Sequence, residues 1–514
     1  MMLTDLLLEA NKNYPNKLAI YSLDSAYTYN ELLSNSIKLS KRLSEYQNSN
    51  VIIHSNNSAE YAIAIFSLLS LNSTIIPVSV TCSENELSYI LKNSNCKLIL
   101  VDEFTKNKYR TVYQGYPIYV LDDLIKEIND AGVNYYDTYK YPTLNQNNKI
   151  AFIIYSSGST GEMKGIKCTH EAICFVIHAI NQVIKHNESD NILCVLPFSF
   201  DYGLYQIFIA MEAFSTIYVH TSLLNPLEIP NIIQKQRITG FPAMPLWLSI
   251  LIETRRLNKT KLQSLRYITS TGDVLKPSII DDIKTEAPGV RIFPMYGLTE
   301  CKRVSILPAD KIESHTESVG LPLSGTSIRI VDDIGNDVPI GEIGELVVSG
   351  PHLMDGYYGD DELTNERYRY NNKLNILELY TGDLFKKDKD GFLYFISRTQ
   401  FFIKRRGQRI SPVIIEELIC RIEDIKDSVI VPVRKNGEEL VVCFIRKNDI
   451  KKELQEIASI IKQRLPNIYN PDFIFEHQAY FPFNNNGKIN RRMLIKLAIH
   501  MIEDQTRKVV DTNY

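Results

Sequence analysis

The residues from Tyr155 to Gly165 are the part of this chain best suited to hold a polyphosphate. They read Tyr-Ser-Ser-Gly-Ser-Thr-Gly-Glu-Met-Lys-Gly and follow an apolar run, Lys149 to Ile154, that predicts a buried strand. Hydroxyls, backbone N–H groups and glycines in such a loop can surround phosphate oxygens, and Lys164 adds a positive charge. The order is not that of the P-loop, because no Ser or Thr follows the lysine. A flexible surface turn is the alternative interpretation.

A second candidate group is the carboxylate of Asp201. It lies in the segment Leu193–Gln206, where a strand is predicted to end at Pro197 and a helix to begin near Tyr202. An aspartate at a helix start can cap the first free N–H groups. It can also face a pocket and hold a substrate ammonium. The sequence leaves these two roles open.

Three further motifs carry residues suited to bind a nucleotide. Met295–Glu300 reads Met-Tyr-Gly-Leu-Thr-Glu, Tyr380–Asp383 reads Tyr-Thr-Gly-Asp with Arg398 further along, and Asn484–Arg491 reads Asn-Asn-Asn-Gly-Lys-Ile-Asn-Arg. Carboxylates bind ribose hydroxyls in nucleotide sites, and a single protein carboxylate often suffices for Mg2+ beside phosphate. Each motif alone is compatible with an ordinary turn.

Taken in this order, the motifs resemble those of the adenylate-forming superfamily, which includes acyl-CoA synthetases, luciferases and the adenylation domains of nonribosomal peptide synthesis. The resemblance covers nearly the whole chain. The sequence departs from the family at Met163, where proline is usual, and at Ser397, where glycine is usual. Gln400 occupies the hinge position, which is commonly Asp or Lys.

The resemblance implies ATP and Mg2+ as cofactors and assigns roles to individual residues. Lys488 would bridge the substrate carboxylate and the α-phosphate, Thr299 would reach that phosphate, and Glu300 would hold the metal. Gln400 would be the hinge, and Gly407 would lie beside the tunnel for the thiol. The residues implied to bind ATP are Ser156, Ser157, Gly158, Ser159, Thr160, Gly161, Lys164, Gly272, Tyr296, Asp383, Phe395 and Arg398.

The same resemblance implies a substrate. Phe200-Asp201 matches the amino-acid-activating members, and the surrounding segments resemble free-standing amino-acid (prolyl) carrier-protein ligases. Arg303 faces either the substrate pocket or solvent, and the sequence does not decide which. The residues expected to bind the substrate are Asp201, Tyr202, Tyr205, Met295 and Val304.

The chain is therefore interpreted as an AMP-forming acid–thiol ligase. We expect it to adenylate a small amino acid, with proline as the first candidate, and to transfer it to the phosphopantetheine thiol of a separate carrier protein. One alternative is an acyl-CoA synthetase for a small aromatic or fatty carboxylic acid. The other is a nucleotide-binding regulator without catalytic activity.

Positioning these groups requires an α/β scaffold, and the sequence predicts one. Helical and strand-like segments alternate through the first part of the chain, which predicts parallel-rich sheets covered by helices. Thr28 and Glu31 have the spacing of a capping box. We expect a large AMP-binding domain over residues 1–397 and a small mobile α+β lid over residues 398–514, with a dispensable tail after Ile499.

Length and composition narrow the class of protein. At 514 residues the chain is too long for one ordinary core, and 44% hydrophobic with 23% charged residues is typical of a globular protein. A net charge of -3 argues against general nucleic-acid binding. The eight cysteines form no CxxC pair, and no apolar run approaches the ~20 residues needed to cross a bilayer. These features predict a cytoplasmic protein without membrane or nucleic-acid partners.

Overall fold

In the computed structural model the described residues are 1–130, 149–157, 163–220, 225–399, 403–405, 408–435, 438–448, 452–478, 480–483 and 489–511. The chain divides into two compact units. The first comprises Met1–Ile328 and Val347–Tyr380, and the second comprises Arg329–Leu346 and Thr381–Tyr514. The boundary expected between residues 397 and 398 lies inside the second unit and stays a prediction.

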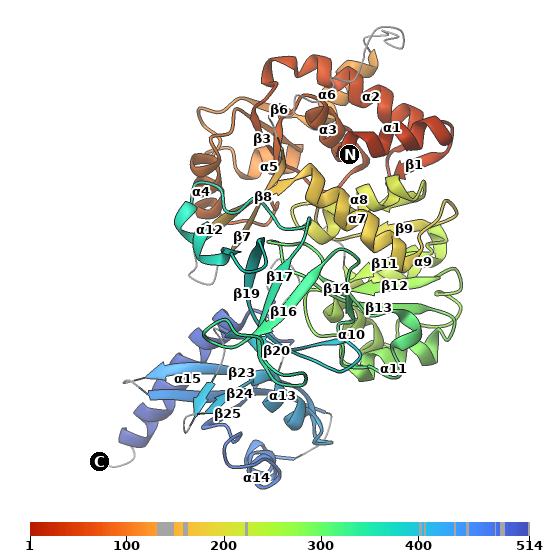
Figure 1. Ribbon diagram of the computed structural model, residues 1–514. Helices are drawn as coiled ribbons and strands as arrows, with labels where there is room; N and C mark the ends of the chain where they lie inside the picture. The colour runs from red at the N-terminus through yellow and green to blue at the C-terminus, as the bar shows by residue number, and fades with distance from the viewer. Residues whose placement is uncertain are drawn as a thin grey trace. The chain divides into compact units, whose positions relative to one another are not determined.

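The first unit contains a nine-stranded sheet in which most neighbouring strands run parallel (Figure 1). Its order is β15-β14-β13-β12-β11-β9-β10-β1-β2. From β9 the next strand, β10, lies on one side and β11 on the other, so the strand order reverses between β9 and β11. The strands are β1 Leu18–Tyr21, β2 Ala26–Thr28, β9 Asn191–Cys194, β10 Thr216–Val219, β11 Gly240–Ala243, β12 Tyr267–Ser270, β13 Arg291–Tyr296, β14 Ser305–Ile306 and β15 Leu321–Pro322.

A six-stranded sheet in the same unit has the order β6-β5-β3-β4-β7-β8. Its central strands are fully buried runs of apolar residues, as expected for parallel strands covered on both faces. The strand predicted at Lys149–Ile154 is confirmed as part of β7, which forms an antiparallel hairpin with β8. The strands are β3 Asn50–His54, β4 Thr74–Pro77, β5 Leu98–Val101, β6 Ile118–Val120, β7 Ile150–Ser157 and β8 Met163–Thr169.

Helices cover these sheets, and their starts follow local sequence signals. The predicted capping box is confirmed: the hydroxyl of Thr28 accepts from the N–H of Glu31 at 3.2 Å, and the N–H of Thr28 donates to the Glu31 carboxylate at 2.8 Å. The helices are α1 Leu3–Asn13, α2 Tyr29–Arg42, α3 Ala59–Ser70, α4 Glu84–Ser94, α5 Glu103–Lys108, α6 Leu121–Asp130, α7 His170–Ile184, α8 Asp201–Glu212, α9 Ile229–Gln236, α10 Pro245–Glu253, α11 Pro277–Glu286 and α12 Asp361–Arg367; the short 3-10 turns are η1 Ser44–Tyr46, η2 Pro226–Glu228 and η3 Ala309–Lys311.

A third sheet has the order β16-β17-β19-β18, with β20 also pairing with β19. The long strand β19 pairs with β18 through its first residues and with β20 through its last ones. The strands are β16 Ser327–Val331, β17 Gly344–Ser349, β18 Tyr368–Asn371, β19 Ile376–Lys387 and β20 Leu393–Arg398.

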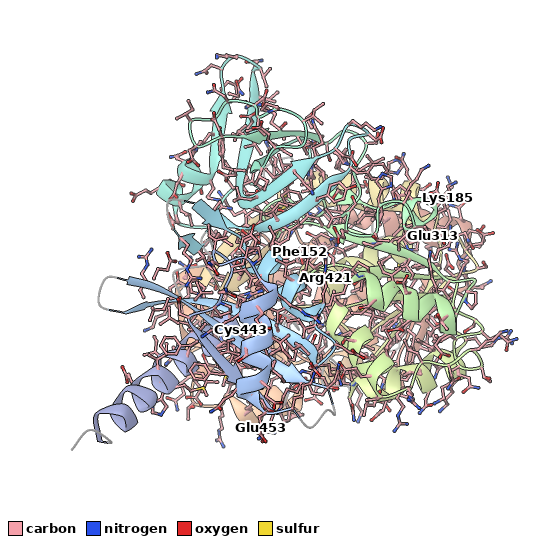
Figure 2. The ribbon with its side chains drawn as sticks, turned by 90° about the horizontal axis from the view of Figure 1, so that it is seen from below. Phe152, Lys185, Glu313, Arg421, Cys443 and Glu453 are labelled. Carbon is pink, nitrogen blue, oxygen red and sulfur yellow. The ribbon has the colours of Figure 1, made fainter. Side chains whose placement is uncertain are left out.

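The last part of the second unit is an α+β fold, as predicted. Its core contains Cys443, which is fully buried on β24 and is labelled in Figure 2. The expectation that the tail after Ile499 is dispensable is wrong at Ile502, which is 2% exposed and belongs to the same buried cluster as Leu494 and Phe481. The elements are β21 Ile403–Arg405, β22 Gln408–Ile410, β23 Ile425–Lys435, β24 Glu438–Lys447 and β25 Phe473–Glu476, with α13 Pro412–Cys420, α14 Leu454–Arg464 and α15 Arg491–Asp511.

The predicted α/β class is therefore confirmed. All eight cysteines are free, and burial raises the pKa of Cys82 to about 11 and that of Cys174 to about 12, so these thiols stay protonated at neutral pH. Within the described residues, no helix has the length and hydropathy that crossing a membrane requires. The same residues contain no group of three or more His, Cys, Asp or Glu side chains arranged to bind a metal.

Three buried histidines and one half-buried histidine should make stability depend on pH. Burial lowers the pKa of His54, His170 and His352 to about 4 and that of His186 to about 3. The unfolded chain, with histidine pKa values of about 6.5, binds more protons than the folded chain between these values. We expect Tm to fall progressively as the pH decreases from about 6.5 to about 4, measured by thermal unfolding across that range.

His54 offers a test of this cause. Its Nδ1 accepts a hydrogen bond from the Tyr113 hydroxyl at 2.7 Å, and its Nε2 lies 3.0 Å from the Ser79 carbonyl oxygen. His54→Gln keeps a donor for that carbonyl but cannot titrate. The variant should lose less Tm than the parent over the same pH range, and an equal loss would show that this histidine is not a source of the effect.

Candidate active site

A narrow cavity of about 20 Å³ lies in the first unit at the carboxyl ends of β9, β12 and β13. This is the edge of the sheet where the strand order reverses, and ligands of open parallel sheets bind at such positions. Figure 1 shows α8 near β9, and α7 packs against α8. The cavity is lined by Val176, Ile180, Ile184, His186, Asp201, Tyr202, Tyr205, Gln206, Ile209, Thr269, Met295, Lys302 and Arg303.

Asp201 lines this cavity and does not cap its helix. The N-cap of α8 is Phe200, Asp201 is the first helical residue, and no side chain caps this helix. The carboxylate is 13% exposed and lies in the first turn, where the helix dipole favours a negative charge. Of the two roles that the sequence left open, the structure is compatible with the one that faces a pocket.

Lys302 brings a buried positive charge to Asp201. Its Nζ lies 3.8 Å from Oδ2 of Asp201 and donates a hydrogen bond to Sγ of Cys168 at 3.1 Å. The same ammonium lies 5.1 Å from the ring centroid of Tyr205. With only 1% of the Lys302 side chain exposed, these contacts replace its hydration.

Arg303 is also buried and also lines the cavity. Its Nη1 donates to the hydroxyl of Thr271 at 2.6 Å, and its guanidinium carbon lies 5.5 Å from the ring centroid of Tyr202. Its Nε is buried and has no hydrogen-bond partner among the described residues. Burial lowers the pKa of Arg303 below its ordinary value, but a guanidinium keeps its charge in proteins. The structure therefore decides between pocket and solvent in favour of the pocket.

Three other predicted substrate residues, Tyr202, Tyr205 and Met295, line the cavity. The Tyr202 hydroxyl donates to the carbonyl oxygen of Thr269 at 2.9 Å, which fixes the ring against β12. Val304 does not join the lining. It is fully buried, and its N–H donates to the Tyr296 carbonyl at 3.0 Å, so it belongs to the strand pairing behind the cavity.

The backbone that presents Lys302 and Arg303 depends on Gly297. A Cβ on Gly297 would lie 1.9 Å from the carbonyl oxygen of Lys302, a distance that no side chain could adopt. Lys302 itself has a φ of 60°, in the left-handed region that costs energy for a lysine. The turn after β13 is thus closed tightly on itself, and glycine is the residue that permits it.

Glu300 is held in the same turn by two tyrosines of the first unit. The Tyr357 hydroxyl donates to Oε1 of Glu300 at 2.8 Å, and the Tyr368 hydroxyl donates to its carbonyl oxygen at 2.9 Å. Oε2 accepts no hydrogen bond within the part of the chain that the structure describes, so it can serve a cation. Thr299 is half-buried in this turn, and Tyr296, which is buried, ends β13.

The predicted phosphate loop connects the two strands of the β7–β8 hairpin. Ser156 is paired with Lys164, and Ser157 with Met163, directly before and after the loop. The Lys164 ammonium lies 5.9 Å from the ring centroid of Tyr357. The loop residues Gly158, Ser159, Thr160 and Gly161 lie outside the described residues. Gly272, with a φ of 97°, follows β12 in a conformation that favours glycine.

In the second unit, Asp383 and Arg398 face each other across the β19–β20 pair. Nε of Arg398 lies 3.3 Å from Oδ1 of Asp383, whose side chain is almost fully buried. Phe395 packs edge to face against Phe385, with the ring centroids 5.6 Å apart. The other predicted residues of this part, Gln400, Gly407 and Lys488, lie outside the described residues.

Lys302 is a site residue that the sequence did not single out. It directly precedes Arg303, and adjacent basic residues after a turn are usually solvated. Its burial depends on packing against Cys168 and Asp201, which come from distant parts of the chain. The available signal was its position directly after the Tyr-Gly-Leu-Thr-Glu motif and one cysteine.

The comparisons with known proteins agree on one type of enzyme. A family model described as "AMP-binding enzyme" matches residues 7–358. Gramicidin S synthase 2 of Brevibacillus brevis is 27% identical over 498 residues, which cover 95% of this chain and 11% of that protein. The chain thus spans about a tenth of that relative's length.

Two solved structures extend the likeness to the fold. VinN, in a complex with L-aspartate, has a TM-score of 0.68 and 28% identity and covers 77% of this chain and 98% of its own. O-succinylbenzoate coenzyme A synthetase of Bacillus subtilis, in complex with ATP and magnesium ion, has a TM-score of 0.80 and 22% identity and covers 95% of this chain and 98% of its own. The second likeness shows the fold alone.

Gly297→Ala should disrupt the turn that carries Lys302 and Arg303. Because the new methyl group would collide with backbone, the turn must shift, and we expect a loss of about 1–3 kcal/mol in the free energy of unfolding, measured by urea denaturation. Gly289→Ala is the matched control, since a Cβ there meets no atom within 4 Å. Equal effects of the two substitutions would contradict the close contact at Gly297.

Proposed function

The chain belongs to the AMP-binding enzyme family, and from that premise we propose that it is an AMP-forming ligase that activates an amino acid and passes it to a thiol. First, a carboxylate oxygen of the amino acid attacks the α-phosphorus of ATP, an acyl-adenylate forms and pyrophosphate leaves. Then the phosphopantetheine thiol of a separate carrier protein attacks the acyl carbon. A thioester forms, AMP leaves and the thiol proton is released.

The position of Asp201 carries the amino-acid part of this proposal. A carboxylate that is largely buried, does not cap its helix and lines a cavity is suited to bind an ammonium group. A fatty acid or a simple aromatic acid has no such group. The alternative acyl-CoA synthetase would bury this carboxylate beside an apolar substrate at a cost in free energy.

The relatives support an amino-acid substrate without defining it. The structure of VinN was solved in complex with L-aspartate, which is an amino acid. Proline, the first candidate from the sequence, stays a prediction. Transfer to a carrier rather than to CoA also belongs to the proposal, and a direct comparison of CoA with a holo-carrier protein as acceptors tests it.

ATP and Mg2+ are the cofactors of this family's reaction, and one relative's structure contains both. Glu300 fits a magnesium site because the Tyr357 hydroxyl holds Oε1 of its carboxylate in place. The other carboxylate oxygen, Oε2, is then available to the metal. The metal would neutralise charge on the phosphates as the carboxylate approaches. Thr299, in the same turn, binds the α-phosphate, and Tyr296 stacks on adenine beside Gly272.

The hairpin that presents Ser156, Ser157 and Lys164 supports phosphate binding by the loop from Gly158 to Gly161. Its antiparallel pairing continues to the residues on either side of the loop, so the ends of the loop are held at a fixed separation. Because the backbone at Ser156 and Lys164 is fixed before the phosphates bind, these two residues lose less entropy on binding.

The second unit supplies the remaining groups of the proposal. Asp383 accepts hydrogen bonds from the ribose hydroxyls, a role that its ion pair with Arg398 supports, since a held carboxylate presents fixed acceptors. Phe395 lies near the nucleotide. Lys488 bridges the substrate carboxylate and the α-phosphate and lowers the cost of bringing two anions together. The lid proposed for residues 398–514 turns at Gln400 to present Gly407 to the thiol.

Asp201→Asn should weaken amino-acid activation much more than ATP binding. Replacing a charged partner of an ammonium by a neutral amide costs about 10- to 100-fold in kcat/KM for the amino acid. The measurement is amino-acid-dependent ATP–pyrophosphate exchange, with ATP binding followed separately by calorimetry.

The matched control is Asp281→Asn, which removes an exposed carboxylate from α11. Asp281→Asn should exchange like the parent. If Asp201→Asn also exchanged like the parent, the ammonium role of Asp201 would be withdrawn. If no carboxylic acid in a broad panel supported exchange, the regulator alternative would replace the ligase.

Glu300→Gln should raise the Mg2+ concentration required for half-maximal exchange. The amide keeps an oxygen for the Tyr357 hydroxyl but loses the charge that attracts the metal, so we expect a shift of about tenfold or more. The measurement is a Mg2+ titration of exchange at fixed ATP. Glu342→Gln, which changes an exposed glutamate, is the control, and an unchanged titration in Glu300→Gln would assign the metal to another ligand.

A further inference from the structure

The cavity beside β9 carries a net positive charge. Three ionised side chains line it, namely Asp201, Lys302 and Arg303. The remaining titratable base in the lining, His186, is neutral at physiological pH because burial lowers its pKa to about 3. One negative and two positive charges therefore face a space from which water is largely excluded, and the sum is one uncompensated positive charge.

The first positive charge is compensated within the protein. The Lys302 ammonium lies 3.8 Å from the Asp201 carboxylate, and its hydrogen bond to Cys168 and the ring of Tyr205 occupy other sides. At 3.8 Å the pair is an ion pair without a hydrogen bond, so the carboxylate keeps its acceptor capacity. Asp201 can accept hydrogen bonds from a substrate ammonium while Lys302 stays beside it.

The second positive charge interacts with the Asp201 carboxylate only at longer range and has no ion-pair partner among the described residues. Arg303 forms no ion pair with any carboxylate among the described residues, and its one side-chain hydrogen bond goes to the neutral hydroxyl of Thr271. Its Nε is buried without an acceptor. A buried cation in this state is costly unless a ligand supplies the missing charge. A planar guanidinium is also the group that best matches a carboxylate, which it binds through two parallel hydrogen bonds.

We propose that the substrate is a short acidic amino acid, of the size of aspartate, whose non-reacting carboxylate binds Arg303 while its ammonium binds Asp201. This inference rests on the proposed adenylation function and names the substrate class of that site. In this arrangement the substrate ammonium faces the negative charge of Asp201, and the non-reacting carboxylate faces the positive charge of Arg303. The other carboxylate of the substrate remains for attack on ATP.

A neutral amino acid fits this cavity less well. The ammonium of proline would satisfy Asp201, but its apolar ring would leave Arg303 buried and unpaired. Tyr202, Tyr205 and Met295 narrow the cavity to space for about one water molecule, so a bound side chain must displace them, and a short side chain displaces them less than a long one. Aspartate or a close analogue of the same chain length is therefore preferred over glutamate.

The first experiment compares substrates of the unmodified protein in ATP–pyrophosphate exchange. The probes are L-aspartate, L-asparagine, L-glutamate, L-proline and succinate. Aspartate should exceed asparagine, its neutral isostere, by about tenfold or more in kcat/KM, because asparagine lacks the charge that Arg303 requires. Succinate, which lacks the ammonium, should also be poor.

The second experiment replaces the guanidinium. Arg303→Met retains a side chain of similar length without the charge, and it should lower kcat/KM for aspartate by about 10- to 100-fold while the ratio of asparagine to aspartate rises. The matched control is Arg291→Met, which removes an arginine from β13 that does not line the cavity. Stabilisation of each variant by aspartate in thermal unfolding provides a readout that does not require turnover.

The outcomes separate this inference from the function on which it rests. Exchange with neutral amino acids but not with aspartate would overturn the inference and keep the ligase. An equal loss for every substrate in Arg303→Met would also overturn it, since Arg303 would then hold the reacting carboxylate. Exchange with no member of a broad panel of acids would overturn the ligase itself, and with it the acidic substrate.

Discussion

A buried guanidinium that forms no ion pair with any described residue is the physical feature on which this cavity depends. Solvation of Arg303 is lost, and the hydroxyl of Thr271 with the ring of Tyr202 replaces only part of it. The backbone that carries this group is tightly closed, because a Cβ on Gly297 would lie 1.9 Å from the carbonyl oxygen of Lys302. The cavity is therefore organised for a negatively charged ligand before that ligand arrives, which reduces the cost of binding it.

The second constraint is topological. The residues of the cavity come from α7 and the segment after it, α8, β12, β13 and the turn after β13, and they meet because the strand order reverses between β9 and β11. Parallel strands direct their carboxyl ends to one edge, so Asp201 after β9 and Arg303 after β13 reach the same space. Local backbone contacts then orient each side chain. The charge of Arg303, the reversal of strand order and the tight turn at Gly297 thus all determine the geometry of one cavity.

In the second unit, strand pairing and packing also determine where individual side chains lie. Asp383 and Arg398 are direct neighbours across two antiparallel strands, so their ion pair follows from the strand register. Cys443 and Ile502 are both buried in this unit, one on a central strand and one on the last helix. The last helix therefore contributes Ile502 to a core, so the tail after Ile499, which was expected to be dispensable, contains a packed residue.

Features that depend on neighbouring residues were predictable from the sequence. The capping box of Thr28 and Glu31, the buried strands and the α/β class follow from spacing and side-chain type, and the ordered motifs indicated the family. Features that depend on residues far apart in the chain were not. Only the tertiary structure shows that Arg303 lines the cavity and that Asp201 does not cap its helix. It also shows that Val304 is buried outside the cavity lining. The reason is physical: burial and charge pairing are properties of packing between distant segments, and a local pattern carries no measure of either.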